Sequence, residues 1–498
     1  MILLLICFGL AGEQEYRRGL DLVKLKRFDE ADAIFRDGRR QCPSDKRFSL
    51  GLAGLEYLRR DYAAAKSHLK RALQLDVADA YANDFLATLF FLDGNLEGAL
   101  KFWNRAGKPK TENVLVEPAS RQIDPVLLDR AIAFAPASVL TLPEYRNTLA
   151  WLDLLDMPAT QRIELAPREE GSFDVRLHLV EPDGWARKIA WLRSLPFQAM
   201  HADFRNINGD AVNWTNMVRW DRNKQRFLTE LAAPVMGNPR RRLRAYGDAR
   251  KELWNTGDGE FRLEKIAAGL EFMSVPSSRF SWRTGMQLSS ERLWNAPKFP
   301  QGVALKYRTG LDWVVLNIPE QRLSINGGAL LEIGKVFASS RALFSRVRFS
   351  LDGRWFPSQR GTDYETRVQI RAGKGFGALP LDELFILGAE RDNDLWLRGH
   401  SGTRNGQKGH APMGAAFLLA NLEVGKRIYS HPLFTIQLGP FADIGRIRDL
   451  LGRPSPSAWI VDPGVHARIR LLGKVEVSLS YGWNVSSGRG LFYSKVEH

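Results

Sequence analysis

The sequence predicts three structural parts: a repeated all-α region, a small α+β domain and a C-terminal antiparallel β-barrel of about 16 strands. Three patterns in the 498 residues support this fold class. Residues 13–110 repeat with a period of about 34 residues, residues 112–182 follow a strand-helix-helix-strand-strand order, and residues 195–498 alternate between polar and apolar side chains. Such alternation is typical of strands, because successive side chains of a strand point to opposite faces.

Small residues and large apolar residues recur at matched positions of the first region. The matched sets are Gly19, Ala53 and Ala87; Ala31, Ala65 and Ala99; Phe35, Leu69 and Trp103; and Gly38, Ala72 and Ala106. Small residues let paired helices approach closely, and large apolar side chains fill the gap between successive hairpins. The pattern resembles three tetratricopeptide repeats, which implies a groove for a partner protein or a simple spacer. An unrelated helical bundle is the alternative.

The second region changes character. A short apolar strand at 114–116 precedes a helix at 124–132 and apolar residues at helical spacing over 142–155, and two alternating strands follow at 162–165 and 173–180. This order resembles a POTRA domain, a periplasmic module. The resemblance implies an exposed strand edge that adds a client strand to its sheet, and a plain connector is the equally open alternative.

From residue 195 onward the alternation persists to the end of the chain. In a membrane barrel the apolar face meets lipid and the polar face meets the lumen, and each tilted strand needs about 9–11 residues. Residues 195–498 then hold five strands after a long loop at 379–412 and ten or eleven before it. A soluble β-sandwich or propeller would also explain the alternation.

One pair of residues links that loop to the barrel wall. Arg398 and Gly399 lie at the centre of the loop. The alternation after Phe434 places Asp443 on the polar face of its strand, and Glu423 lies on the polar face of the neighbouring strand. A guanidinium fork binds a carboxylate through two hydrogen bonds. We therefore expect Arg398 to enter the lumen and pair with Asp443, and Glu423 to be a further partner.

These elements resemble the outer-membrane assembly and two-partner secretion superfamily, which includes BamA/TamA proteins and bacterial surface antigens. In that family the arginine of the sixth extracellular loop docks on the acidic residue of a Phe-x-Asp-x-Gly strand, which Phe441, Asp443 and Gly445 match. His400 departs from the usual Phe or Tyr, and the departure concerns the packing of the loop tip. An ordinary surface loop with a solvated arginine is the alternative.

Composition narrows the class of protein. The net charge is +15, but no Lys/Arg block with interleaved aromatics appears, so we expect no nucleic-acid partner. No apolar run approaches the roughly 20 residues of a membrane-spanning helix. We find no catalytic constellation, no metal-ligand pattern and no phosphate loop, so we expect neither an enzyme nor a cofactor.

The first residues predict export. Residues 1–12 are apolar and end in Gly9-Leu10-Ala11, a small-x-small pattern that suits signal-peptide cleavage. Cleavage would leave Cys42 as a lone cysteine.

The resemblance implies a bacterial outer-membrane barrel, surrounded by outer-membrane lipid, that assembles, inserts or translocates polypeptides. Its N-terminal domains would lie in the periplasm and capture an unfolded or secreted polypeptide client, and the repeats would be a site for a periplasmic protein. A passive export porin for polysaccharide or small solutes is the alternative, because tetratricopeptide scaffolds are also joined to such barrels. A third hypothesis is that the protein is a soluble scaffold for protein interactions.

Overall fold

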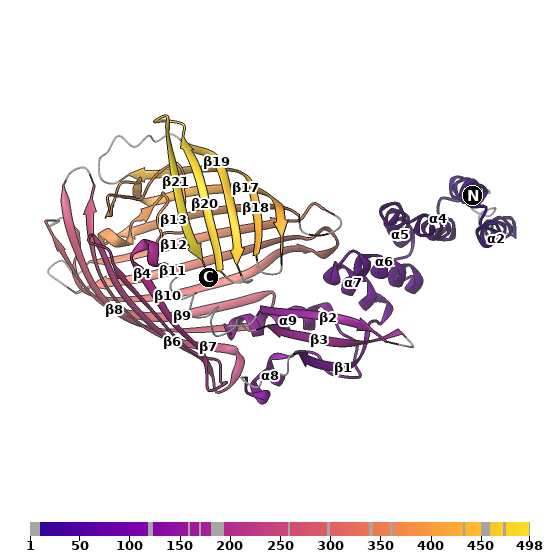
Figure 1. Cartoon of the computed structure of the whole chain (residues 1–498), viewed down its shortest axis with the longest axis horizontal. Coiled ribbons are helices and arrows are strands. Elements are labelled where there is room, and N and C mark those ends of the chain that lie inside the picture. The colour runs from indigo at the N-terminus through magenta and orange to yellow at the C-terminus, as the bar shows by residue number, and fades with distance from the viewer. Residues whose placement is uncertain are drawn as a thin grey trace.

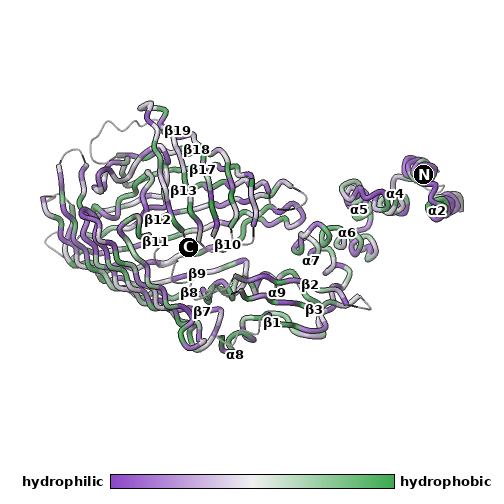
Figure 2. Tube along the Cα trace, viewed as in Figure 1, coloured by the Kyte–Doolittle hydropathy of each residue, from purple (hydrophilic) through white to green (hydrophobic). Residues whose placement is uncertain are grey.

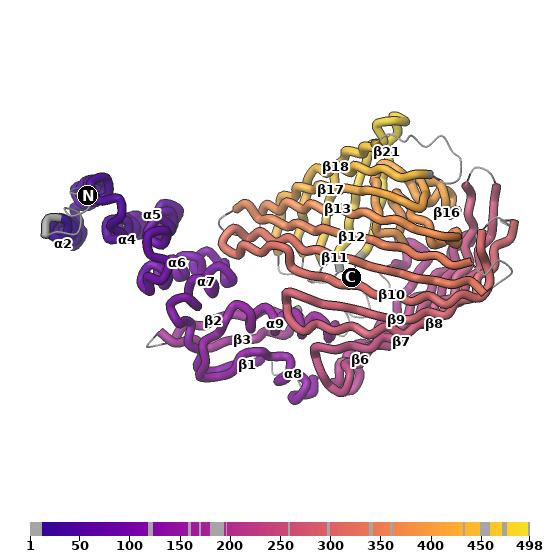
Figure 3. Tube along the Cα trace, turned by 180° about the vertical axis from the view of Figure 1, so that it is seen from behind, coloured from indigo at the N-terminus to yellow at the C-terminus, as the bar shows by residue number. Residues whose placement is uncertain are grey.

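The structure is a computed structural model with three parts arranged along the long axis of the molecule (Figure 1). The helices lie at one end, a three-stranded sheet follows, and a large curved sheet forms the other end; the view from behind in Figure 3 shows the same order. The structure describes residues 10–117, 123–157, 160–168, 171–180, 194–256, 259–295, 299–337, 342–358, 361, 363–431, 434–449, 459–471 and 475–497.

The N-terminal part is built from three helical hairpins. The helices are α2 (Leu10–Lys24), α3 (Phe28–Gln41), α4 (Lys46–Leu58), α5 (Tyr62–Leu75), α6 (Ala80–Leu92) and α7 (Leu96–Trp103), followed by the 3-10 turn η1 (Asn104–Ala106). Their starts repeat because their caps repeat: the side chains of Asp45, Asp61, Asp79 and Asn95 accept hydrogen bonds from backbone N–H groups at the starts of α4 to α7. The predicted period is therefore confirmed as helical hairpins, while the tetratricopeptide assignment stays a resemblance.

The matched small residues are needed for packing. Phe35 is fully buried, and side chains added at Gly19 or Gly51 would collide with its ring. Cys42 is disulfide-bonded in the full chain, and a lone Cys42 after signal-peptide cleavage stays a prediction. The predicted signal peptide, residues 1–12, lies mostly outside the described residues, which begin in α2.

The second part has the predicted element order. It contains β1 (Lys110–Glu117), α8 (Pro125–Ala131), α9 (Leu142–Leu154), β2 (Thr160–Pro167) and β3 (Ser172–Val180). The strand order is β1-β3-β2, with β1 parallel and β2 antiparallel to β3, so β1 and β2 are both edges of this sheet. The POTRA assignment itself stays a resemblance.

One hydrophobic core joins this sheet to the last two hairpins. The rings of Trp103 and Phe173 lie 5.3 Å apart, and those of Phe91 and Phe173 lie 6.2 Å apart. Buried residues from Ala53 to Leu179 belong to the same cluster. The boundary predicted near residue 110 therefore does not separate two cores.

The third part is a single large sheet whose strand order is that of a closed barrel. A 3-10 turn, η3 (Leu195–Phe197), leads into it. Its strands are β4 (Ala199–Ile207), β5 (Val212–Trp220), β6 (Lys224–Val235), β7 (Asn238–Asn255), β8 (Glu260–Ser277), β9 (Phe280–Trp294), β10 (Gly302–Ile318), β11 (Leu323–Val336), β12 (Leu343–Trp355), β13 (Tyr364–Gly377), β14 (Phe385–Ile386), β15 (Thr403–Arg404), β16 (Gln407–Lys408), β17 (Met413–Ser430), β18 (Phe434–Asp449), β19 (Ile460–Leu471), β20 (Val475–Asn484) and β21 (Arg489–Glu497).

Among the described residues, three of the eighteen strands are two-residue segments of the loop and fifteen are longer. Ten of the longer strands precede the loop and five follow it, against about 16 predicted. The consecutive long strands pair antiparallel, as in the pairing of β13 with β17. This strand order places β4 next to β21.

The two faces of the large sheet differ in chemistry, and hydrophobic and hydrophilic residues alternate along its strands in Figure 2. Apolar side chains such as Phe227, Ile266 and Leu288 are exposed on the outer face. Charged side chains such as Lys265 and Glu332 are buried on the inner face. Separately, none of the described helices is long and apolar enough to cross a membrane.

The N-terminal parts pack on one end of the barrel, which we call the near end. The Lys101 ammonium lies 2.7 Å from the Glu320 carboxylate, in the 3-10 turn η4 (Pro319–Gln321) between β10 and β11. Asn95 donates to the Pro319 carbonyl at 2.9 Å, and Trp151 of α9 donates to the Val275 carbonyl at 2.9 Å. The opposite end, where the long loop leaves β13, is the far end.

Candidate functional site

The loop that follows β13 folds back into the barrel from the far end. It contains the 3-10 turn η5 (Leu381–Glu383) and the short segments β14, β15 and β16. Leu387, Leu395 and Leu397 of the loop are buried against Phe417 and Ile447 of the wall. This apolar contact fixes the loop backbone and carries its polar groups to the lumen face of the sheet.

Arg398 binds Asp443 through a complete two-pronged contact. Its Nε donates to Asp443 Oδ2 at 2.9 Å and its Nη2 donates to Oδ1 at 2.7 Å. The backbone N–H of Arg398 also donates to Oδ2 at 2.9 Å. The two residues are 4% and 0% exposed, so the pair is withdrawn from bulk water.

Further wall residues complete the arginine pocket. Arg398 Nη1 also donates to Glu423, which Arg468 contacts as well. The Phe441 ring lies under the guanidinium, 3.5 Å from its central carbon. Burial alone would lower the pKa of Arg398, and hydrogen bonding to Asp443 outweighs it and raises that pKa, so the arginine stays charged in place.

Asn421 is a member of the site that sequence reasoning missed. Its amide donates to Asp443 Oδ1 at 2.6 Å and to the Trp396 carbonyl at 2.8 Å. It therefore joins the acidic residue of the wall to the loop backbone. Asn421 lies two residues before Glu423 on β17 and opposite Asp443 on β18, so alternation and strand register together could have indicated it.

The glycine and the histidine of the loop tip bind a second wall carboxylate. The Gly399 N–H donates to Asp462 Oδ2 at 2.8 Å, and His400 Nδ1 lies 2.8 Å from the same oxygen. His400 Nε2 lies 2.9 Å from the amide nitrogen of Asn484. A neutral imidazole with its proton on Nδ1 satisfies both contacts. His400 and Asp462 therefore hold the loop tip through a polar contact, at the position where the family that the loop motif resembles has a Phe or Tyr.

Two glycines make room for the loop. A side chain at Gly445 would come within 3.2 Å of Leu387 and Leu397. A side chain at Gly482 would collide with the backbone of Arg398. The glycine of the Phe-x-Asp-x-Gly pattern is thus explained by close approach of the loop to β18.

A second anchor, which sequence reasoning also missed, holds the start of the loop. Asp382 lies 2.6 Å from the Lys265 ammonium, and Glu383 lies 2.8 Å from that of Lys306. Arg250 also contacts Asp382. The partners come from β7, β8 and β10, so only the strand register of the folded barrel brings them together.

A third anchor holds the middle of the loop. Asp392 lies 2.7 Å from the Arg219 guanidinium and Glu390 is paired with Lys224, while Lys408 of the loop lies 2.6 Å from Glu252 of the wall. The Asp392 side chain is 15% exposed. Burial alone would raise the pKa of Asp392, and the charges of Lys224 and Lys408 outweigh burial and hold that pKa well below its usual range.

The loop also touches both sides of the junction between β4 and β21. The Arg391 guanidinium lies over the Phe197 ring, just before β4. The Trp396 ring packs edge-on against Tyr493 of β21, 5.4 Å between centres, and the Lys495 ammonium lies 4.5 Å from the Trp396 ring. Residues 391–396 of the loop thus contact both the segment that leads into β4 and the last strand, β21.

No protein-family model matches the sequence, and no curated protein matches it either. Solved structures do match. CdiB from Escherichia coli is 13% identical, with 78% of this chain and 76% of that chain covered and a TM-score of 0.53.

This chain has the fold of CdiB. CdiB from Acinetobacter baumannii is 11% identical, with 78% and 73% of the two chains covered and a TM-score of 0.48. BamA from Haemophilus ducreyi lacking POTRA domains 1–3 is 10% identical, with 79% and 85% covered and a TM-score of 0.46. The likeness to the Escherichia coli CdiB confirms, at the level of the fold, the resemblance that the loop and strand motifs indicate.

The arrangement joins a long loop to the wall of the sheet through buried polar contacts. Its acids and bases are paired with one another, and the described residues contain no group of acidic, histidine or cysteine side chains placed to bind a metal ion. That the protein is not an enzyme stays a prediction. The role of Arg398, Gly399, Glu423, Phe441, Asp443 and Gly445 as a loop lock also stays a prediction, although their contacts are those expected from the sequence.

Proposed function

We propose that this chain is an outer-membrane β-barrel that inserts or translocates polypeptides. The observation that carries the proposal is the buried two-pronged contact of Arg398 with Asp443, which holds a long loop inside a barrel that has the fold of CdiB. The outer face of the barrel carries exposed apolar side chains, which suits contact with lipid.

The N-terminal parts would lie in the periplasm and capture the client. The edge at β2, and the edge at β1 beyond its bridge from Lys110 to Val139, would add an extended client strand, because a strand edge presents backbone groups for pairing. The helical hairpins would extend this surface or bind a periplasmic protein. The near end of the barrel, where these parts pack, then faces the periplasm and the far end faces outward.

The loop anchors weigh against the alternative, a passive export porin. The anchors of the loop reach the wall at β5 to β10 and at β17 to β20. A loop held across the lumen at so many points would obstruct a permanently open channel. A porin of this architecture should therefore conduct only weakly until the loop is released.

The test compares strains that carry the wild-type chain, Arg398→Ala, or no copy of the gene. Quantitative proteomics of the cell surface and the medium should show proteins lost in the deletion strain and reduced in Arg398→Ala at equal barrel abundance. Arg446→Ala is the matched control, because Arg446 is an exposed arginine of the same strand as Asp443. Identical protein delivery in all strains would refute the proposal. Large, stable conductance of the wild-type protein in planar bilayers, unchanged in Arg398→Ala, would favour the porin.

A further inference from the structure

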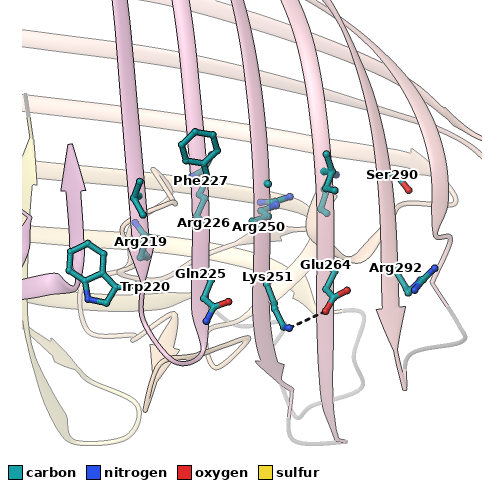
Figure 4. A pocket seen from close by; sticks show the side chains of 14 residues that line it. Arg219, Trp220, Gln225, Arg226, Phe227, Arg250, Lys251, Glu264, Ser290 and Arg292 are labelled. Atoms are coloured by element: carbon teal, nitrogen blue, oxygen red, sulfur yellow. Dashed lines mark ion pairs between the residues drawn. The ribbon is translucent and has the colours of Figure 1, made fainter. Parts of the chain in front are cut away.

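The outer face of the barrel carries a hollow at the far end of β5 to β9. Its volume is about 560 Å³, and it spans five neighbouring strands (Figure 4). The inner faces of these strands hold Arg219, Arg250 and Lys265, which bind the loop. The hollow therefore lies back to back with the second and third loop anchors, on the opposite side of the sheet.

An apolar row forms the part of the hollow closer to the middle of the barrel. Strand register places Phe227, Ala249, Ile266 and Ser290 side by side on β6 to β9. Phe227 and Ile266 are 48% and 69% exposed, whereas Ala249 and Ser290 are small and leave the depression. A row of this kind accepts a flexible hydrocarbon chain, which buries apolar area against both large side chains.

A polar row lies two residues further toward the far end. Register places Gln225, Lys251, Glu264 and Arg292 side by side on the same four strands, and Figure 4 shows them at one level. Lys251 lies 3.3 Å from Glu264, so one carboxylate faces two cations. The Arg292 guanidinium lies 5.5 Å from the Trp294 ring.

Two cations flank Glu264 in the polar row, which leaves one net positive charge there to attract a phosphate group. Lys251 and Arg292 lie on β7 and β9, two strands apart, so their backbones are about 10 Å apart. Two long side chains converge readily on an anion across that span, and an arginine binds phosphate oxygens through its planar fork. The apolar row begins about 7 Å away along the strands, the order in which a lipid presents headgroup and chain.

We propose that this hollow binds a phosphate-bearing lipid of the membrane leaflet at the far end. The phosphate lies between Lys251 and Arg292, and an acyl chain lies over Ala249, between Phe227 and Ile266. The proposal rests on the membrane location given under the proposed function. Bound lipid would brace the wall from outside at the strands whose inner faces bind the loop.

The test uses purified full-length protein in detergent and native mass spectrometry with dioleoyl phosphatidic acid as the probe. The Lys251→Gln/Arg292→Gln double variant should retain the lipid about tenfold less than wild type, because two charge-assisted contacts are lost. The matched control, Arg446→Gln/Arg448→Gln, removes two exposed arginines from β18 and should retain it as wild type does. Equal retention in all three proteins would overturn the proposal.

Two further arms separate the possible sources of binding. Ala249→Leu fills the hollow without changing charge and should also reduce retention; unchanged retention would overturn the acyl-chain position. Dioleoylglycerol should not be retained, and inorganic phosphate should not displace the lipid; displacement by phosphate alone would show an anion site instead of a lipid site. Each variant is first shown to be folded, by a difference in gel mobility between unboiled and boiled samples. Because binding is measured without a client, its failure is distinct from a failure of polypeptide delivery.

Discussion

The guanidinium carbon of Arg391 lies 3.7 Å from the centre of the Phe197 ring, which joins the loop to the chain segment that leads into β4. Five residues later, Trp396 packs on Tyr493 of β21. We therefore expect the loop to brace the junction between β4 and β21.

Replacing Trp396 should weaken this brace. Trp396→Ala removes the contacts with Tyr493 and Lys495 and the hydrogen bond that its indole N–H donates to the Asn393 carbonyl at 2.7 Å, and should cost about 1–2 kcal/mol. The temperature at which the folded barrel loses its fast gel mobility should fall. Trp483→Ala, which removes an exposed tryptophan from β20, is the control and should change that temperature less. Equal shifts for the two variants would contradict the brace.

Removing the charge of Asp443 should destabilise the loop strongly. Asp443→Asn removes the two-pronged partner of the buried Arg398 and leaves Glu423 as its carboxylate, so the cost should be about 3 kcal/mol, at the lower end for a buried pair. Loss of protection from an added protease within the loop would report its release. Asp312→Asn is the control, because the Asp312 side chain is half-exposed and lies 3.8 Å from its arginine.

A double variant tests whether the two residues act together. Asp443→Asn combined with Arg398→Gln removes both charges, so its free-energy cost should be well below the sum of the two single variants. Additive costs would show that Arg398 and Asp443 are not coupled.

The sequence was sufficient to predict the Arg398 site because its residues lie in short local patterns. Alternation after Phe434 placed Asp443 on the lumen face, and an arginine in a long loop had one obvious type of partner. Asp462 was missed because its contact with Gly399 depends on how far β19 is shifted against β18. The same limit hid the anchors of Asp382 and Asp392, whose partners come from strands more than 70 residues away in the chain.

The number of strands was harder to predict than their nature. A period of two identifies a strand, yet it does not fix where a long strand ends and a turn begins, so about 16 strands were expected and fifteen long ones are described. The helical hairpins were predicted more closely, because small and large apolar residues recur at matched positions with a period of 34 residues.

The loop should stay in place as the pH falls from 7 to 5. The folded-state pKa of Asp392 is depressed, so its contribution to stability is present above the unfolded-state pKa of about 3.9 and is lost only as the pH falls through the lower folded-state value. A spin label at an Arg404→Cys variant should give the same mobility at pH 7 and pH 5. A label at Arg446→Cys on the outer face reports any general unfolding, and release of the loop at pH 5 with that label unchanged would contradict the prediction.

Reversing one charge should loosen the N-terminal part from the barrel. Lys101→Glu places two carboxylates together at η4, and Lys101→Glu/Glu320→Lys should restore the contact. The pair is largely buried, so the single variant should cost about 1–2 kcal/mol and the double variant clearly less. Distances between spin labels on α7 and β11 should broaden in the single variant alone. Equal broadening in both would show that other contacts fix this position.

The three helical hairpins, α2 to α7, form an arm whose residues belong to two separate hydrophobic cores, and this division determines where hairpins can be added or removed. The first hairpin packs on the start of the second in a separate cluster around Phe35 and Phe48, whereas the last hairpin shares a core with the three-stranded sheet through Trp103 and Phe173. Hairpins can therefore be gained or lost at the outer end by simple duplication or trimming, each stacking on the one before it. The innermost hairpin has no such freedom, because the sheet would lose part of its interior with it. Arms of different reach can in this way be carried by an unchanged barrel.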